Sequence, residues 1–146
     1  MRALLPYLFT GIHTYQAIDK FIKRGVKTNI HYVLSDGSID EAIERLQDDA
    51  FPKGINAVIF LLHKPVGSGK KKNVLCLADK RIRIFFGGVQ NRKFPFKTGF
   101  DSCSVPGILN YMDKINRISI EACEGARFSC YISPDMKMTP APLIRK

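Results

Sequence analysis

The feature that most constrains the fold is a regular alternation of helical and extended segments between residues 14 and 117. Apolar residues recur at helical spacing in residues 14–24, 38–46, 79–89 and 104–115, and strand-like stretches lie between them at 26–34, 57–62 and 94–100. Strands that alternate with helices favour crossover connections and a parallel sheet. Three parallel strands alone leave two free edges, which suits a piece of a barrel better than an independent domain. The sequence therefore predicts an α/β fold, specifically a fragment of a partial (β/α) barrel.

Local patterns refine this prediction. Ser38 and Glu41 have the spacing of a capping box, and Asp79 and Ser104 are placed to cap the two later helices. The continuous apolar run at 57–62 is typical of a parallel strand that is covered on both faces.

The pattern changes after residue 117. Residues 128–133 and 136–139 predict a β-hairpin around Pro134 and Asp135, because proline favours this turn position. We therefore expect two parts: residues 1–117 as the barrel part, and residues 118–146 as a small C-terminal β-hairpin extension.

Charge is concentrated in one segment. From Lys64 to Lys97 there are ten basic residues and one acid, Asp79, so this segment carries +9 of the net charge of +10. Such a segment indicates either an anionic partner such as nucleic acid or a solvated, lysine-rich surface. Aromatic residues do not alternate with these lysines, so stacking on single-stranded nucleic acid is not indicated. The Gly-Ser-Gly-Lys sequence at 67–70 lacks the spacing of a phosphate-binding P-loop.

The cysteines are the strongest candidates for chemistry. No apolar run approaches the roughly 20 residues of a membrane span, and no signal peptide is evident, so we expect a cytoplasmic protein without disulfides. Cys103 directly follows the third predicted strand, and strand ends face the active site in parallel sheets. Cys123 and Cys130 lie just before and within the predicted hairpin. The spacing alone leaves two alternatives, which are iron–sulfur ligands and buried, inert thiols.

Two stretches carry a family resemblance. Residues 100–103 read Phe-Asp-Ser-Cys, and residues 123–135 read Cys-Glu-Gly-Ala-Arg-Phe-Ser-Cys-Tyr-Ile-Ser-Pro-Asp and continue to Thr139-Pro140. They resemble radical S-adenosylmethionine enzymes that have a C-terminal SPASM or twitch extension. The strands at 26–34 and 57–65 are similar to the fourth and fifth strands of that family's partial barrel. The resemblance covers most of residues 14–140.

The resemblance implies a cofactor set and a site. Cys103, Cys123 and Cys130 would be ligands of an auxiliary four-iron–four-sulfur cluster. Ser35, His63 and Asp101, at the ends of the three strands, would face the cavity that holds S-adenosylmethionine. Intact members of the family cleave this cofactor reductively and form a radical, and peptides or proteins are common substrates in this branch. The implied partners are therefore such a substrate, or a complementary N-terminal half of the enzyme.

Two departures from the family pattern limit the expected activity. The four cysteines do not form the Cys-x-x-x-Cys-x-x-Cys motif that holds the catalytic cluster, which we expect to precede Met1 in a complete protein. Pro140-Ala141 stands where the family has Pro-Cys. The sequence therefore predicts a fragment that is not catalytically complete. The alternatives are a non-enzymatic basic α/β module that binds nucleic acid through Lys64–Lys97, and a partner-dependent fragment without activity.

Overall fold

The computed structural model describes residues 12–65, 69–76, 78–121, 123–125 and 127–139. Its helices and strands follow in the order α1 (Ile12–Lys23), β1 (Asn29–Leu34), α2 (Ile39–Gln47), β2 (Ala57–Leu62), α3 (Lys80–Asn91), β3 (Lys97–Phe100), α4 (Val105–Tyr111), β4 (Tyr131–Ile132) and β5 (Met138–Thr139). Three short 3-10 turns, η1 (Lys71–Asn73), η2 (Ser102–Ser104) and η3 (Arg117–Ser119), lie between them. The predicted alternation of helices and strands is confirmed, although β1, β3 and α4 are shorter than expected.

The three long strands form one parallel sheet in the order β1-β2-β3, which is also their order in the chain. Tyr32 of β1 lies opposite Phe60 of β2, and Phe60 lies opposite Phe100 of β3. The α/β class and the parallel pairing are thus confirmed. The described residues form an open sheet and do not close it into a barrel.

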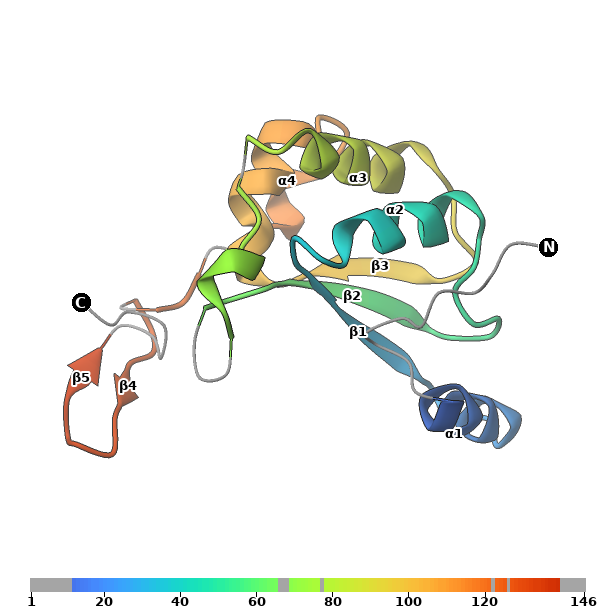
Figure 1. Ribbon diagram of the computed structural model, residues 1–146, viewed down its shortest axis with the longest axis horizontal. Helices are drawn as coiled ribbons and strands as arrows, with labels where there is room; N and C mark the ends of the chain where they lie inside the picture. The colour runs from blue at the N-terminus through green and yellow to red at the C-terminus, as the bar shows by residue number, and fades with distance from the viewer. Residues whose placement is uncertain (1–11, 66–68, 77, 122, 126, 140–146) are drawn as a thin grey trace.

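The helices α2, α3 and α4 cover the same face of this sheet (Figure 1). Ile30, Tyr32 and Leu34 of β1 point into that layer and are buried, whereas the alternate residues of β1 are exposed. On β2, Ile59 and Leu61 are only half-buried. None of the residues 57–62 is exposed, but the second face is less buried than the first, so the predicted covering of both faces is only partly seen in the described residues. We call the second face, defined by His31, Val33, Ile59, Leu61 and Gly99, the bare face.

Aromatic rings fill the core between the sheet and its helices. The ring of Phe60 lies at the centre, 4.8 Å from that of Phe85, 5.9 Å from that of Phe100 and 6.0 Å from that of Tyr32, measured between centroids. Most of these pairs are tilted or edge-to-face, which is the favoured arrangement of aromatic quadrupoles. The rings of Phe60 on β2 and Phe100 on β3 both contact Phe85 and therefore tie these strands to α3.

The three predicted helix caps have different outcomes. Asp79 caps α3 as expected, because its Oδ1 accepts a hydrogen bond of 2.9 Å from the backbone of Arg81. Ser38 makes no cap, since its hydroxyl donates to the carbonyl of Val33 at the end of β1. Ser104 makes no cap either, since its hydroxyl donates to Asp101. In both cases the serine hydroxyl donates to a residue at the end of the preceding strand and does not bond to the backbone of the following helix.

The predicted hairpin is present but short. β4 and β5 pair in antiparallel fashion, and Pro134 and Asp135 occupy the turn, which the Met136 amide closes by donating to the Ser133 carbonyl at 2.8 Å. Figure 1 shows this hairpin standing apart from the helices and the sheet. None of the described helices is long and apolar enough to cross a membrane.

Candidate functional site at the strand ends

The ends of the three parallel strands meet at one edge of the sheet. The amide of His63 donates to the carbonyl of Leu34 at 2.7 Å, and the amide of Asp101 donates to that of Phe60 at 3.1 Å. Ser35, His63 and Asp101, the three residues predicted to face a cofactor, therefore all follow this edge directly. Carboxyl ends of parallel strands are the usual place for a ligand site in α/β folds.

Asp101 is the most constrained of these residues. Its Oδ1 accepts a 2.6 Å hydrogen bond from the hydroxyl of the fully buried Ser104. Its Oδ2 is excluded from solvent, accepts no well-directed hydrogen bond from the described residues, and lies 3.0 Å from the ammonium nitrogen of Lys64. The carboxylate is thus held by one hydroxyl and one ion pair.

The same ammonium group also interacts with Cys103. Burial would lower the pKa of Lys64, but its interactions with Asp101 and Cys103 outweigh burial and raise that pKa above its ordinary value. Cys103 is half-buried in η2, directly after β3. The structure therefore brings together one predicted metal ligand, one predicted cofactor residue and a lysine that the sequence analysis had not singled out. Lys64 directly follows His63, but nothing local indicates that its side chain turns toward β3.

Ser35 and His63 are held within their own loops. The hydroxyls of Ser35 and Ser38 lie 2.9 Å apart, and the Ser35 amide donates to the Ser38 hydroxyl at the same distance. A ring nitrogen of His63 lies 3.1 Å from the carbonyl oxygen of Lys70. Both polar side chains lie at their predicted strand ends. Each is oriented by residues of its own loop.

The remaining predicted ligands lie on the extension. Cys123 and Cys130 are exposed, free thiols on either side of a turn in which the Phe128 amide donates to the carbonyl of Glu124. Within the described ranges, no three His, Cys, Asp or Glu side chains are grouped closely enough to hold one metal ion. Ala141, at the expected fourth ligand position, lies outside the described residues.

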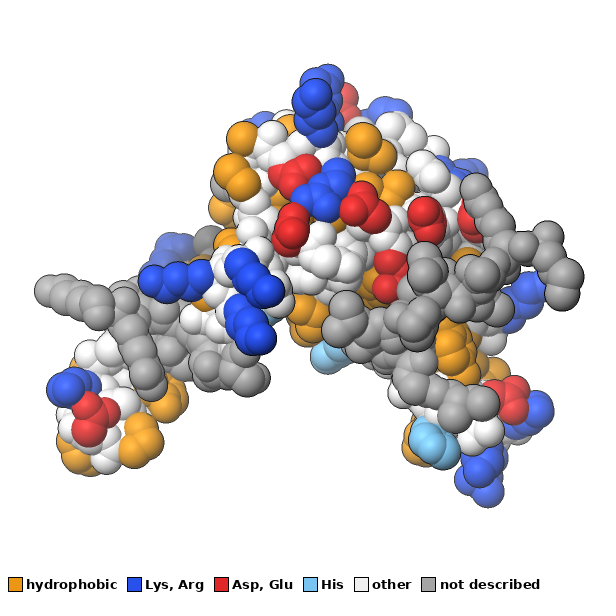
Figure 2. All heavy atoms as spheres, in the orientation of Figure 1, with side chains coloured by type: hydrophobic (Ala, Val, Ile, Leu, Met, Phe, Trp, Pro, Cys, Tyr) orange, Lys and Arg blue, Asp and Glu red, His pale blue; other side chains and the backbone are white. Residues whose placement is uncertain are grey.

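A charged cluster that the sequence did not indicate joins the β1 end to α3. The guanidinium of Arg81 contacts three carboxylates, at 2.5 Å from Asp36, 3.0 Å from Asp40 and 2.7 Å from Asp79. Hydrogen bonds to Asp79, then to Asp36 and Asp40, raise the pKa of Arg81. Figure 2 shows acidic side chains gathered around a basic one over α2 and α3. Two of these acids lie about 40 positions away in sequence, so no local pattern predicts the cluster.

The basic segment does not form one patch. Lys64 and η1 follow the carboxyl end of β2, whereas Arg92, Lys93 and Lys97 surround the opposite, amino end of β3. Arg81 is enclosed by carboxylates, and Lys64 is paired with Asp101. The positive charge of Lys64–Lys97 is therefore divided between two ends of the sheet.

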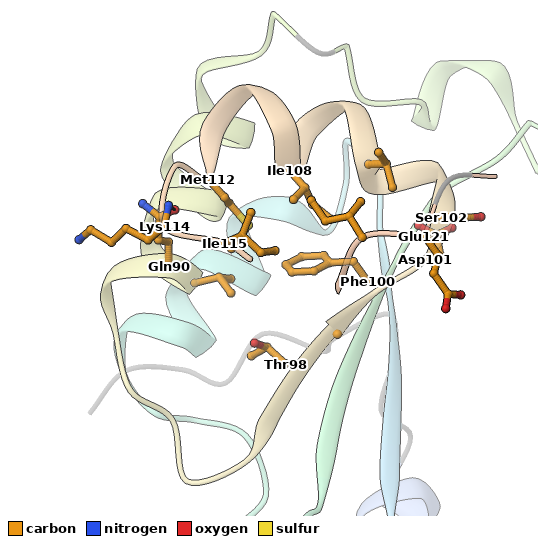
Figure 3. Close-up of a pocket in the computed structure, with 14 residues that line it drawn as sticks. Gln90, Thr98, Phe100, Asp101, Ser102, Ile108, Met112, Lys114, Ile115 and Glu121 are labelled. Carbon is orange, nitrogen blue, oxygen red and sulfur yellow. Dashed lines mark hydrogen bonds between the residues drawn. The ribbon is translucent and has the colours of Figure 1, made fainter. Parts of the chain in front are cut away.

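A cavity of about 560 Å³ lies beside β3, below α4 (Figure 3). Its lining is a mixture of apolar and polar residues, and charged groups stand at its two ends. The apolar side chains in the lining are those of Val89, Phe100, Val105, Ile108, Met112, Ile115 and Ile120. The helical spacing of residues 104–115 predicted Ile108, Met112 and Ile115 on one helix face, and it did not predict a cavity.

Comparison of the chain with protein-family models, with curated proteins and with solved structures found no match.

Proposed function

We propose that this chain is the C-terminal part of a radical S-adenosylmethionine iron–sulfur enzyme. The observation that carries the proposal is the arrangement of the sheet: parallel strands in chain order, with α2, α3 and α4 on one face and a bare face opposite. A section of barrel wall has this arrangement, because its helices lie outside and its other face lines the interior. The bare face would then be the inner surface of a partial barrel.

The strand-end residues would hold S-adenosylmethionine at the rim of that surface. Ser35 offers a hydroxyl, His63 a ring nitrogen and Asp101 a carboxylate, all at the carboxyl edge of the sheet. When bound to a reduced cluster, this cofactor supplies the radical that abstracts hydrogen. In this proposal the chain's own residues bind and orient the cofactor, and the Lys64–Asp101 ion pair fixes one of its contacts.

Cys103, Cys123 and Cys130 would ligate the auxiliary cluster. Thiolates are the soft ligands that iron–sulfur clusters require, and all three cysteines are free thiols. An all-cysteine cluster normally takes four ligands, and three thiolates leave one iron open to solvent. We therefore expect an oxygen-sensitive cluster that is present at less than one equivalent per chain.

Iron content tests this assignment. The chain would be reconstituted anaerobically with iron and sulfide, and its iron, sulfide and visible charge-transfer absorption would be measured. We expect Cys103→Ala, Cys123→Ala and Cys130→Ala each to lose iron. Cys76→Ala is the matched control, because Cys76 is also an exposed free thiol but lies in the loop before α3. Equal iron in all four variants and the wild type would refute the ligand assignment.

Nucleic-acid binding is not proposed as a second function. Its support was the charge of Lys64–Lys97, and the fold divides that charge between opposite ends of the sheet. A phosphate backbone needs several cations along one continuous path.

A further inference from the structure

We propose that the cavity beside β3 binds an extended peptide, which adds to the free edge of the sheet as a fourth strand. Within the described residues β3 pairs only with β2, so its other edge has no strand beside it. A free edge in a groove is the usual basis of peptide recognition by strand addition. This inference is independent of the proposed iron–sulfur function, because it requires neither a cluster nor a cofactor.

The backbone direction along β3 determines which of its amides and carbonyls can bond to an added strand. The amides of Lys97 and Asp101 donate to Asn56 and Phe60 on the β2 side, at 3.0 Å and 3.1 Å. Backbone groups alternate in direction along a strand, so the amides and carbonyls of Thr98 and Phe100 point away from β2. Thr98 and Phe100 both line the cavity. An occupant of this edge therefore needs a backbone with matching donors and acceptors.

The residues that line the cavity determine which side chains such a peptide can carry. α4 follows β3 and lies over the position next to it, and Ile108 and Met112 of this region line the cavity roof (Figure 3). Ile115 and Ile120 close the cavity beyond the helix. A strand in this position would place alternate side chains against that apolar wall. The cavity thus selects an extended peptide with apolar residues at alternate positions.

The charged residues at the two ends of the cavity indicate which end of the bound peptide carries a basic residue. Lys114 lies at one end and Glu121, with Asp101, at the other (Figure 3). The Lys114 ammonium donates to Asn91 at 2.8 Å, and Asp101 is paired with Lys64, whereas Glu121 is exposed. We infer that the peptide carries a basic residue at the Glu121 end.

The test uses the purified, iron-free chain and fluorescein-labelled octapeptides of alternating valine and threonine, with a lysine either first or last. Fluorescence anisotropy should detect binding of at least one version. Two N-methylated forms of that peptide, blocked at odd or at even positions, should differ, because only one set of amides faces β3. No binding of either version, or equal binding of both methylated forms, would overturn the proposal.

Substitutions at the edge complete the test. Thr98→Pro removes an amide that does not serve the β2 pairing, and proline is tolerated on edge strands. It should weaken peptide binding about fivefold relative to Thr98→Val, which also lacks the hydroxyl but keeps the amide, and this is the effect of one lost hydrogen bond. Circular dichroism and the thermal midpoint would show that both variants are folded, and the methylated peptides decide the question if Thr98→Pro is not.

Two further results distinguish between possible occupants of the free edge of β3. Glu121→Lys should weaken binding of the lysine-tipped peptide, and an unchanged affinity would contradict the stated polarity. A wild-type dimer that disappears in Thr98→Pro, without any peptide binding, would assign the edge to a second copy of the chain and overturn the proposal.

Discussion

Ser104 is a small residue with a large structural role at the strand ends. It has no exposed surface, and its hydroxyl donates to Oδ1 of Asp101, whose other oxygen faces Lys64. The side chain of Asp101 is only 13% exposed, so water offers little compensation if this hydroxyl is removed. Buried polar groups that lose their partner retain the full cost of desolvation.

Ser104→Ala should therefore lower the free energy of unfolding by about 1–3 kcal/mol. Ser102→Ala is the matched control, because Ser102 is exposed on the same turn and should change stability by less than about 0.5 kcal/mol. Urea unfolding followed by circular dichroism measures both. Equal stability of the two variants would contradict the role assigned to the Ser104 hydroxyl.

At the level of elements, α3 and α4 pack through a close approach at Gly107. A Cβ atom added to Gly107 would lie 2.5 Å from Cε2 and 2.8 Å from Cζ of Phe86, a fully packed ring of α3. Gly88, within α3 itself, has nothing within 4 Å of the same position. The two helical glycines therefore differ in purpose: one permits packing, and the other only weakens its helix.

Opposite effects are expected from the same substitution at these glycines. Gly107→Ala should destabilise the protein by about 1–3 kcal/mol, because the Phe86 ring has to shift within a packed core. Gly88→Ala should stabilise it by about 1 kcal/mol, the difference in helix propensity. Thermal and urea unfolding of both variants check the signs. A neutral or stabilising Gly107→Ala would show that α4 can move away from α3.

Comparison of sequence and structure shows which features a local sequence pattern is sufficient to predict. The Asp79 cap was predictable because it depends on residues two positions apart. The strand-end positions of Ser35, His63 and Asp101 followed from strand order alone. The Arg81 cluster and the Lys64–Asp101 pair were not predictable, because their partners come from different loops. The difference in burial between the two faces of residues 57–62 was not predictable, because an apolar run does not reveal which face the helices cover.

For the whole molecule, the bare face bears directly on the proposed function. His31, Val33, Ile59 and Leu61 lie on a sheet surface that α2, α3 and α4 leave uncovered. If this face lines a barrel interior, the rest of that interior has to come from residues other than those of α1 to α4. The sequence also contains no Cys-x-x-x-Cys-x-x-Cys motif, so under the proposed function the catalytic cluster would need another source.

The chain by itself should therefore not cleave S-adenosylmethionine. After anaerobic reconstitution with iron and sulfide, incubation with a strong reductant and the cofactor should yield no 5′-deoxyadenosine above a protein-free blank. A known radical enzyme treated identically serves as the positive control. Reproducible turnover by this chain would refute both the prediction and its basis in the missing motif.

The order β1-β2-β3 also bears on how the sheet is assembled. Because spatial order follows chain order, each new strand can join an edge that the preceding residues have already formed, as the chain leaves the ribosome from its amino end. No later strand has to be inserted between two strands that have already paired. Among the described residues no strand joins the outer edge of β3, so the edge formed last borders the groove beneath α4.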